Sequence, residues 1–191
     1  MHPDLRSESK LHLMRALVVM AATWPLTALS QSDGPLELVD DVDLERYQGR
    51  WYEIALLPNR FQDQCVADTA AEYTLTENGR IRVVNRCRTA DGDFNRVVGE
   101  ARSADERPAS FEVRFAPKWL SWLPFVWGDY QIMALDDDYQ WAMVGAPSRK
   151  YLWIISREPS LPESRIESLL AEARRQGFDT EAVVRSPQRD S

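Results

Sequence analysis

The chain contains few of the residues that catalytic and metal sites use most often. Both histidines, His2 and His12, precede a hydrophobic N-terminal stretch, so the rest of the 191 residues contain no imidazole. The common serine and cysteine nucleophiles need a histidine base, and the sequence therefore excludes those enzyme classes from the rest of the chain. Glycine is also scarce, and no glycine-rich phosphate loop is present.

Blocks of positive charge are a second absence. The formal net charge is −7, and the lysines and arginines are scattered along the chain. We therefore expect no nucleic-acid partner and no polybasic membrane patch. The acidic run Asp136-Asp137-Asp138 lacks the ligand spacing of an EF-hand loop, which favours a solvated hairpin turn over a calcium site. The sequence predicts neither a metal nor a cofactor.

Long apolar runs are missing except near the N-terminus. There Arg15 precedes the apolar residues 16–22, and the small residues Ala28 and Ser30 stand at the two positions that a signal peptidase reads. We predict a secretory signal peptide over residues 1–30. An uncleaved membrane anchor is the alternative, but the apolar run is short and a proline interrupts it.

Cysteine is scarce too, and its placement is informative. No cysteine stands directly at the end of the predicted signal peptide, where a lipid-modified N-terminus needs one, so we expect an exported protein without a lipid anchor. Cys65 and Cys87 both lie in the exported part. An oxidising compartment and an even count favour a disulfide between them, which would stabilise the fold by about 3 kcal/mol through its effect on the unfolded chain. The alternative is a pair of unrelated buried thiols.

Short segments in which apolar and polar residues alternate make up most of the chain after the predicted signal peptide. Most are separated by turn residues, as at Glu77-Asn78-Gly79-Arg80, where a hairpin requires positive φ. Eight strands joined by hairpins predict an all-β fold, an eight-stranded up-and-down antiparallel barrel that can hold one small ligand. The predicted strands begin at residue 51 and cover 51–57, 71–76, 81–87, 94–102, 110–115, 130–135, 140–145 and 151–156.

The spacing of apolar residues changes from that of a strand to that of a helix only near the C-terminus. Ser160 and Glu163 form a capping box, and Gly177 is a stop signal. Apolar residues at helical spacing between them predict one amphipathic α-helix packed outside the barrel. We assign residues 36–184 to the barrel domain and predict that the polar residues 185–191 form a disordered tail.

Three short motifs lie in order on this strand pattern: Gly49-x-Trp51-Tyr52 at the entry to the first strand, Asp138-Tyr139 between the sixth and seventh, and Arg157 after the eighth. Together they resemble the motifs of the lipocalins. The resemblance is closest to the bacterial outer-membrane branch related to apolipoprotein D and covers about residues 36–184. It implies a structural role for the motif residues Gly49, Trp51, Tyr52, Asp138, Tyr139 and Arg157. Alternate connections of such a barrel meet at one rim, where we expect the guanidinium of Arg157 to stack on the indole of Trp51.

The opposite rim receives the two cysteines and an aromatic loop at 117–127. This loop is too apolar to be left in water without a partner, and we predict that it dips into a lipid surface or guides an acyl chain. The alternatives are that it folds back over the mouth or forms a homodimer contact. Its aromatic residues are Trp119, Trp122, Phe125 and Trp127.

The ligand-binding interior follows from the alternation of each strand. Glu53 and Asn85 are its polar candidates, either to orient a head group or to make structural hydrogen bonds. The mostly apolar walls suit a fatty tail. The predicted inward set is Glu53, Ala55, Tyr73, Leu75, Val83, Asn85, Phe115, Tyr130, Ile132 and Trp153.

These patterns, with the resemblance, predict a non-enzymatic carrier for a fatty acid or lysophospholipid. Its expected role is to store or move the lipid for outer-membrane maintenance, in the periplasm and associated with the outer membrane. A lipid-modifying barrel enzyme, or an interaction module that uses the aromatic loop, is the alternative.

Overall fold

The structure is a computed structural model of the chain, and it describes residues 34–116, 123 and 126–189. The predicted signal peptide lies outside the described residues, as do Trp119, Trp122 and Phe125 of the aromatic loop.

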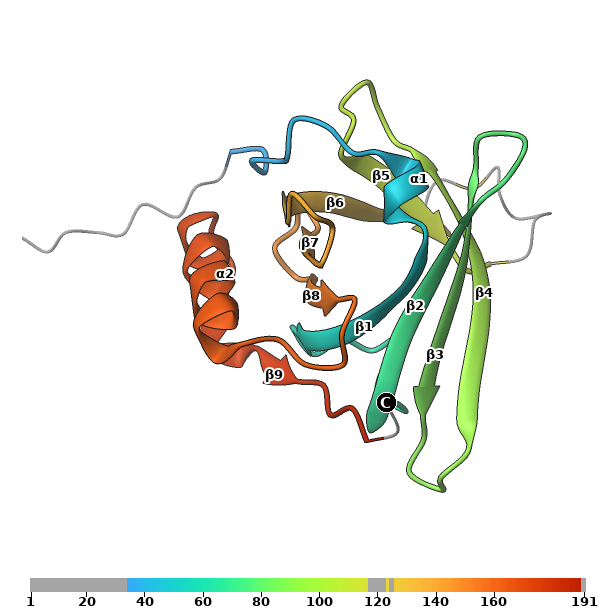
Figure 1. Cartoon of the computed structure of the whole chain (residues 1–191), viewed down its shortest axis with the longest axis vertical. Coiled ribbons are helices and arrows are strands. Elements are labelled where there is room, and N and C mark those ends of the chain that lie inside the picture. Colours follow the sequence, from blue (N-terminus) through green and yellow to red (C-terminus); the bar gives the residue numbers. More distant parts are fainter. Residues whose placement is uncertain (1–33, 117–122, 124–125, 190–191) are drawn as a thin grey trace, which may run out of the picture. The chain divides into compact units, whose positions relative to one another are not determined.

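Eight consecutive antiparallel strands close on themselves into a barrel (Figure 1). The sheet order is β2-β3-β4-β5-β6-β7-β8-β1-β9, and the additional β1–β2 pairing completes the ring. The short helix α1 (Leu44–Tyr47) precedes the first strand. The strands are β1 (Gly49–Leu56), β2 (Ala67–Leu75), β3 (Ile81–Arg88), β4 (Phe94–Ser103), β5 (Ser110–Arg114), β6 (Gly128–Leu135), β7 (Trp141–Gly145), β8 (Leu152–Ser156) and β9 (Val184–Arg185). The predicted up-and-down barrel is confirmed.

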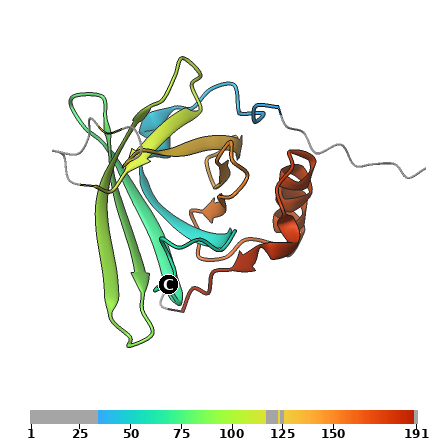
Figure 2. The ribbon, with the colours of Figure 1, turned by 180° about the vertical axis from the view of Figure 1, so that it is seen from behind.

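Helix α2 (Glu163–Arg175) lies outside the barrel (Figures 1 and 2), as predicted. Its buried face, with Ile166, Leu169 and Ala173, joins an outer hydrophobic core that also contains residues of β1, β6, β7 and β8. The predicted capping box is wrong, because Pro162 is the N-cap and no side-chain capping bond is made. The fixed φ of a proline suits it to a helix start, so the first turn forms without the serine.

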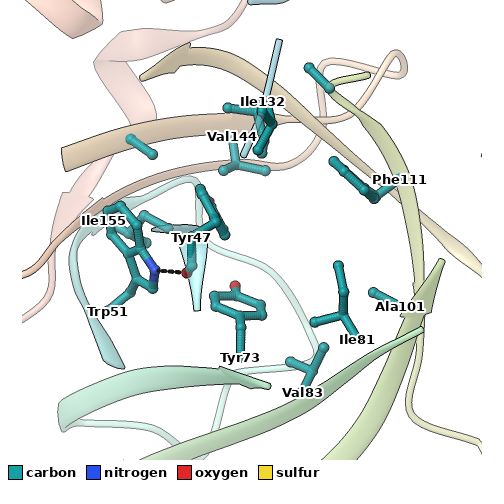
Figure 3. Close-up of a cluster of buried hydrophobic side chains, with 13 residues drawn as sticks. Tyr47, Trp51, Tyr73, Ile81, Val83, Ala101, Phe111, Ile132, Val144 and Ile155 are labelled. Atoms are coloured by element: carbon teal, nitrogen blue, oxygen red, sulfur yellow. Dashed lines mark hydrogen bonds between the residues drawn. The ribbon is translucent and has the colours of Figure 1, made fainter. Parts of the chain in front are cut away.

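A second hydrophobic core fills the barrel interior, and Figure 3 shows its side chains converging from several strands. Strand β1 contributes to both cores because its alternate side chains face opposite sides of the barrel wall. Its pairing with β8 also shifts by one residue between Glu53 and Ala55. Such a bulge reverses which side chains face inward beyond it. Ala55 therefore belongs to the outer core with α2, and its prediction as an inward residue is wrong.

The C-terminal tail is ordered as far as residue 189. Strand β9 pairs with the end of β1, and the backbone N–H of Ser186 donates to the carbonyl of Ile54 (3.0 Å). The backbone N–H of Asp68 in β2 donates to the carbonyl of Pro187 (2.8 Å). Strands β1 and β2 pair with each other only over Gly49–Tyr52, so the tail supplies partners to their separated halves. The predicted disorder is therefore wrong for residues 185–189.

Candidate ligand-binding site

One end of the barrel is closed by Trp51. Its side chain is fully buried, and its indole Nε1–H donates to the carbonyl of Tyr47 in α1 (2.8 Å). The guanidinium carbon of Arg157 lies 3.9 Å from the centroid of the indole ring. The predicted contact between these two side chains is present, and it puts the positive charge behind the tryptophan, outside the barrel interior.

The same guanidinium ties three segments together. Its Nη1 donates to the carbonyl of Arg50 (2.8 Å), its Nη2 to that of Arg46 (2.7 Å) and its Nε to that of Tyr139 (3.3 Å). Gly49 adopts φ +91°, and a Cβ there would stand 3.4 Å from Nη1 of Arg157. The backbone conformation therefore favours a glycine here, while the guanidinium stands at an ordinary van der Waals distance from the position of a Cβ.

The other motif residues surround this closure. The hydroxyl of Tyr139 accepts a hydrogen bond from the backbone N–H of Asp43 (2.8 Å), and the guanidinium of Arg46 lies 4.1 Å from the Tyr139 ring centroid. Asp138 is exposed in the turn. Tyr52 faces the outer core. The motif residues thus lie at or behind the closed end.

A cavity of about 800 Å³ occupies the interior. Eight of the predicted inward residues line it, namely Glu53, Tyr73, Val83, Asn85, Phe115, Tyr130, Ile132 and Trp153. Leu75 does not line the cavity and packs instead against the interior core. Most other lining side chains are apolar, including Ile81, Phe111, Val113 and Ile155. A space of this size and composition suits an elongated apolar ligand.

Three tyrosines form a hydrogen-bonded chain above the closed end. The hydroxyl of Tyr130 lies 2.9 Å from that of Tyr47 and 2.9 Å from that of Tyr73. The ring of Tyr47 packs at 4.8 Å, centroid to centroid, from the indole of Trp51. Burial raises the pKa of Tyr73 to about 12 and raises those of Tyr47 and Tyr130 well above the ordinary value, so all three phenols are neutral at physiological pH.

Tyr47 was not among the predicted inward residues. It precedes the first strand, where the alternation of strands gives no information. The apolar spacing of Leu44 and Tyr47 is the sequence signal for a side chain directed into the barrel, and both residues line the cavity.

A buried carboxyl group lies nearer the mouth. Glu53 is 6% exposed, and its oxygens accept hydrogen bonds from Nε2 of Gln62 (2.6 Å) and from Oγ of Ser186 (2.5 Å). The amide oxygen of the same Gln62 accepts from Nε1 of Trp153 (2.9 Å). Burial raises the pKa of the Glu53 carboxyl. Glu53 thus connects the loop after β1 and the C-terminal tail to the cavity wall.

The mouth loop is held by the disulfide. Cys65 and Cys87 are bonded, with their Cα atoms 5.5 Å apart, as predicted. Across the mouth, Trp127 of the aromatic loop lines the cavity, with the guanidinium carbons of Arg102 and Arg114 at 4.0 and 5.1 Å from its ring centroid. The Trp127 side chain is therefore fixed against the barrel wall.

A metal site and a membrane-spanning helix are both absent from the part of the chain that the structure describes. It contains no group of three or more histidine, cysteine, aspartate or glutamate side chains placed to hold a metal ion. No helix in these residues has the length and apolar character needed to span a bilayer.

A closed antiparallel barrel with one sealed end and a large apolar cavity defines the class of small-ligand-enclosing barrel proteins. The model of a lipocalin-like domain matches residues 42–188. The chain belongs to this lipocalin family, whose members generally bind and carry small hydrophobic ligands.

Similar proteins agree with this assignment. Temperature-induced lipocalin-1 of Arabidopsis thaliana is 40% identical over 82% of this chain and 84% of its own length. Outer membrane lipoprotein Blc of Citrobacter freundii is 34% identical over 90% of this chain and 96% of its own. Among solved structures, insecticyanin of Manduca sexta superposes with a TM-score of 0.63 at 20% identity, covering 82% of this chain and 86% of its own, which supports the fold alone. The resemblance inferred from the three motifs is confirmed.

Proposed function

We propose that the protein binds a single-chain lipid, a fatty acid or a lysophospholipid, inside the barrel and stores or transports it. The observation that carries this proposal is the cavity of about 800 Å³ with mostly apolar walls. Burying an acyl chain there contributes about 0.8 kcal/mol for each methylene group removed from water. A polar head would remain at the mouth, where Arg60 and Gln64 line the opening.

The cellular setting is the second part of the proposal. The predicted signal peptide and the match to outer membrane lipoprotein Blc support export to the periplasm and a role in maintaining the outer membrane. The residue immediately after the predicted cleavage site is Gln31 and not a cysteine, which supports association without a lipid anchor. We also propose that the aromatic loop at 117–127 contacts a membrane surface or forms a homodimer interface.

Lipid binding is tested with two neighbouring positions on β4. Val97 lines the cavity and Val98 does not, while both are similarly exposed, at 43% and 44%. We expect Val97→Asp to weaken the binding of palmitic acid and lysophosphatidylcholine because it places a charge on the cavity wall. Val98→Asp should leave binding unchanged.

Native mass spectrometry and quenching of tryptophan fluorescence measure the bound lipid. Retention of neither lipid by the wild-type protein would overturn the proposed function. Equal loss of binding in the two variants would place the lipid outside the cavity.

A further inference from the structure

The three tyrosines above the closed end have one more hydrogen-bond donor than they can use among themselves. Each phenol carries one O–H group, and Tyr130 is hydrogen-bonded to both Tyr47 and Tyr73. The two hydrogen bonds use two of the three hydroxyl protons, whichever phenol is the donor in each bond. Among the residues that the structure describes, these phenols make no other hydrogen bond, so one O–H remains to be matched.

This surplus donor faces the lipid cavity. Tyr47, Tyr73 and Tyr130 all line it. Figure 3 shows the Tyr73 hydroxyl directed toward the middle of the surrounding side chains. A buried donor without a partner is unfavourable, which favours a ligand that brings an acceptor to this point.

A second polar group on the same wall lacks a partner. The amide oxygen Oδ1 of Asn85 is buried and accepts no hydrogen bond in the described part of the chain. On β3, Asn85 is the next inward position after Val83, which pairs with Tyr73, so it lies one step nearer the mouth. Because this oxygen is itself buried, it is not open to the cavity, and the polar contact offered at the closed end is the surplus tyrosine donor.

The charge distribution restricts what this region can accept. Among the described residues, the cationic side chains that line the cavity are Arg60 and Arg86, and neither acts electrostatically on the three tyrosines. The carboxyl group of Glu53 does act on Tyr73, and it would repel an anion there. Arg157 stands behind Trp51, outside the cavity lining. A carboxylate or phosphate entering this end would lose its hydration and would meet no cationic side chain in the cavity lining, since the charge of Arg157 reaches Tyr47 only from behind the indole. A neutral oxygen would not incur this cost.

We infer that the closed end is a polar subsite for a neutral oxygen, and that the preferred ligand is an acyl chain with a hydroxyl or keto group at or near its methyl end. Such a group accepts the surplus O–H of the tyrosines. This inference rests on the proposed function, because the chain must first occupy the cavity with its ionised head at the mouth.

Matched ligand pairs test the subsite. Lauric and palmitic acid are compared by calorimetric titration with their ω-hydroxy analogues, which differ from them by one neutral oxygen. We expect the wild-type protein to bind at least one of the ω-hydroxy analogues about three- to tenfold more tightly than its parent acid. Equal affinities within both pairs would overturn the inference and leave the proposed function standing, whereas no binding by any of the four would overturn both.

Two variants separate this role from packing. Replacing Tyr47, Tyr73 and Tyr130 together by phenylalanine removes all three hydroxyls without changing the ring packing, and the preference for the ω-hydroxy acids should disappear. The single Tyr73→Phe variant keeps two phenols and one bond, so it still has one surplus donor and should keep the preference. Loss of preference in Tyr73→Phe, or its persistence in the triple variant, would contradict the inference. Thermal melts check folding, and if the triple variant does not fold the wild-type pairs decide alone.

Discussion

The closed end of the barrel and its open end are stabilised by different interactions. At the closed end, one buried indole and one guanidinium join α1, β1, the turn before β7 and the end of β8. At the open end, β1 and β2 separate, and the gap is filled by the disulfide-bonded loop and the C-terminal tail. The first end depends on close packing, whereas the second depends on a covalent bond and on hydrogen bonds from distant segments.

This difference matches the division between stability and binding. The motif residues pack closely against one another and serve the fold, and the cavity begins only above them, at the inner face of Trp51 and the three tyrosines. The open end leaves polar groups such as Glu53 and Gln62 at the border of the cavity, where small rearrangements change access. Substitutions at the two ends should therefore have separable effects.

The largest expected effect is on folding stability, from Trp51→Ala. Removing a fully buried indole leaves a cavity and should lower the free energy of unfolding by about 3–5 kcal/mol. Trp153→Ala, a change of the same kind at a half-buried residue nearer the mouth, should cost less stability and weaken lipid binding more. Urea denaturation and lipid titration of both variants measure this. Equal destabilisation by the two would remove the distinction between the ends.

A smaller effect is expected from Arg157→Lys. A lysine keeps the charge but cannot reproduce three donations and ring stacking together, so we expect a loss of about 2 kcal/mol in the free energy of unfolding.

Arg165→Lys is the matched control for this change. Arg165 also lies over a tryptophan, Trp141, at 4.7 Å, but it is exposed on α2. Its replacement should cost less than about 0.5 kcal/mol, because exposed surface substitutions rarely exceed this. A similar loss in both variants would show that stacking alone, without the carbonyl contacts, accounts for the role of Arg157.

The smallest expected effect concerns the pH dependence of stability through Glu53. Its carboxyl has an ordinary pKa of 4.5, and burial raises the pKa in the folded state. The folded protein therefore holds this proton more tightly than the unfolded chain does. The contribution of Glu53 to stability is complete below pH 4.5 and is lost as the pH rises through the raised pKa.

Glu53→Gln tests this because it is neutral at every pH. Compared with the wild type, the variant should lose less stability between pH 4.5 and neutrality, as measured by urea denaturation across that range. Its lipid binding should be retained if Glu53 mainly anchors the loop after β1 and the tail. Parallel stability profiles for the two proteins would show that the carboxyl does not titrate differently on folding.

The sequence by itself determined the barrel and its closure. Alternation with a period of two located the strands, and the turn at Gly79, with φ +75° in the structure, fixed the first complete hairpin. An up-and-down order brings alternate connections to one rim, which is why Trp51 and Arg157 could be placed together. Alternation also located most of the cavity wall, because a regular strand needs no tertiary information to set its faces.

Only the tertiary structure decided the features that depend on distant partners. The bulge after Glu53 turned Ala55 outward because pairing with β8 sets the register there. The tail became ordered because the separated halves of β1 and β2 needed hydrogen-bond partners. The hydroxyl of Tyr47 reaches the chain formed with Tyr130 and Tyr73 because α1 places this side chain in the interior core at the closed end. In each case the local sequence is compatible with several conformations, and contacts between residues far apart in the chain select one of them.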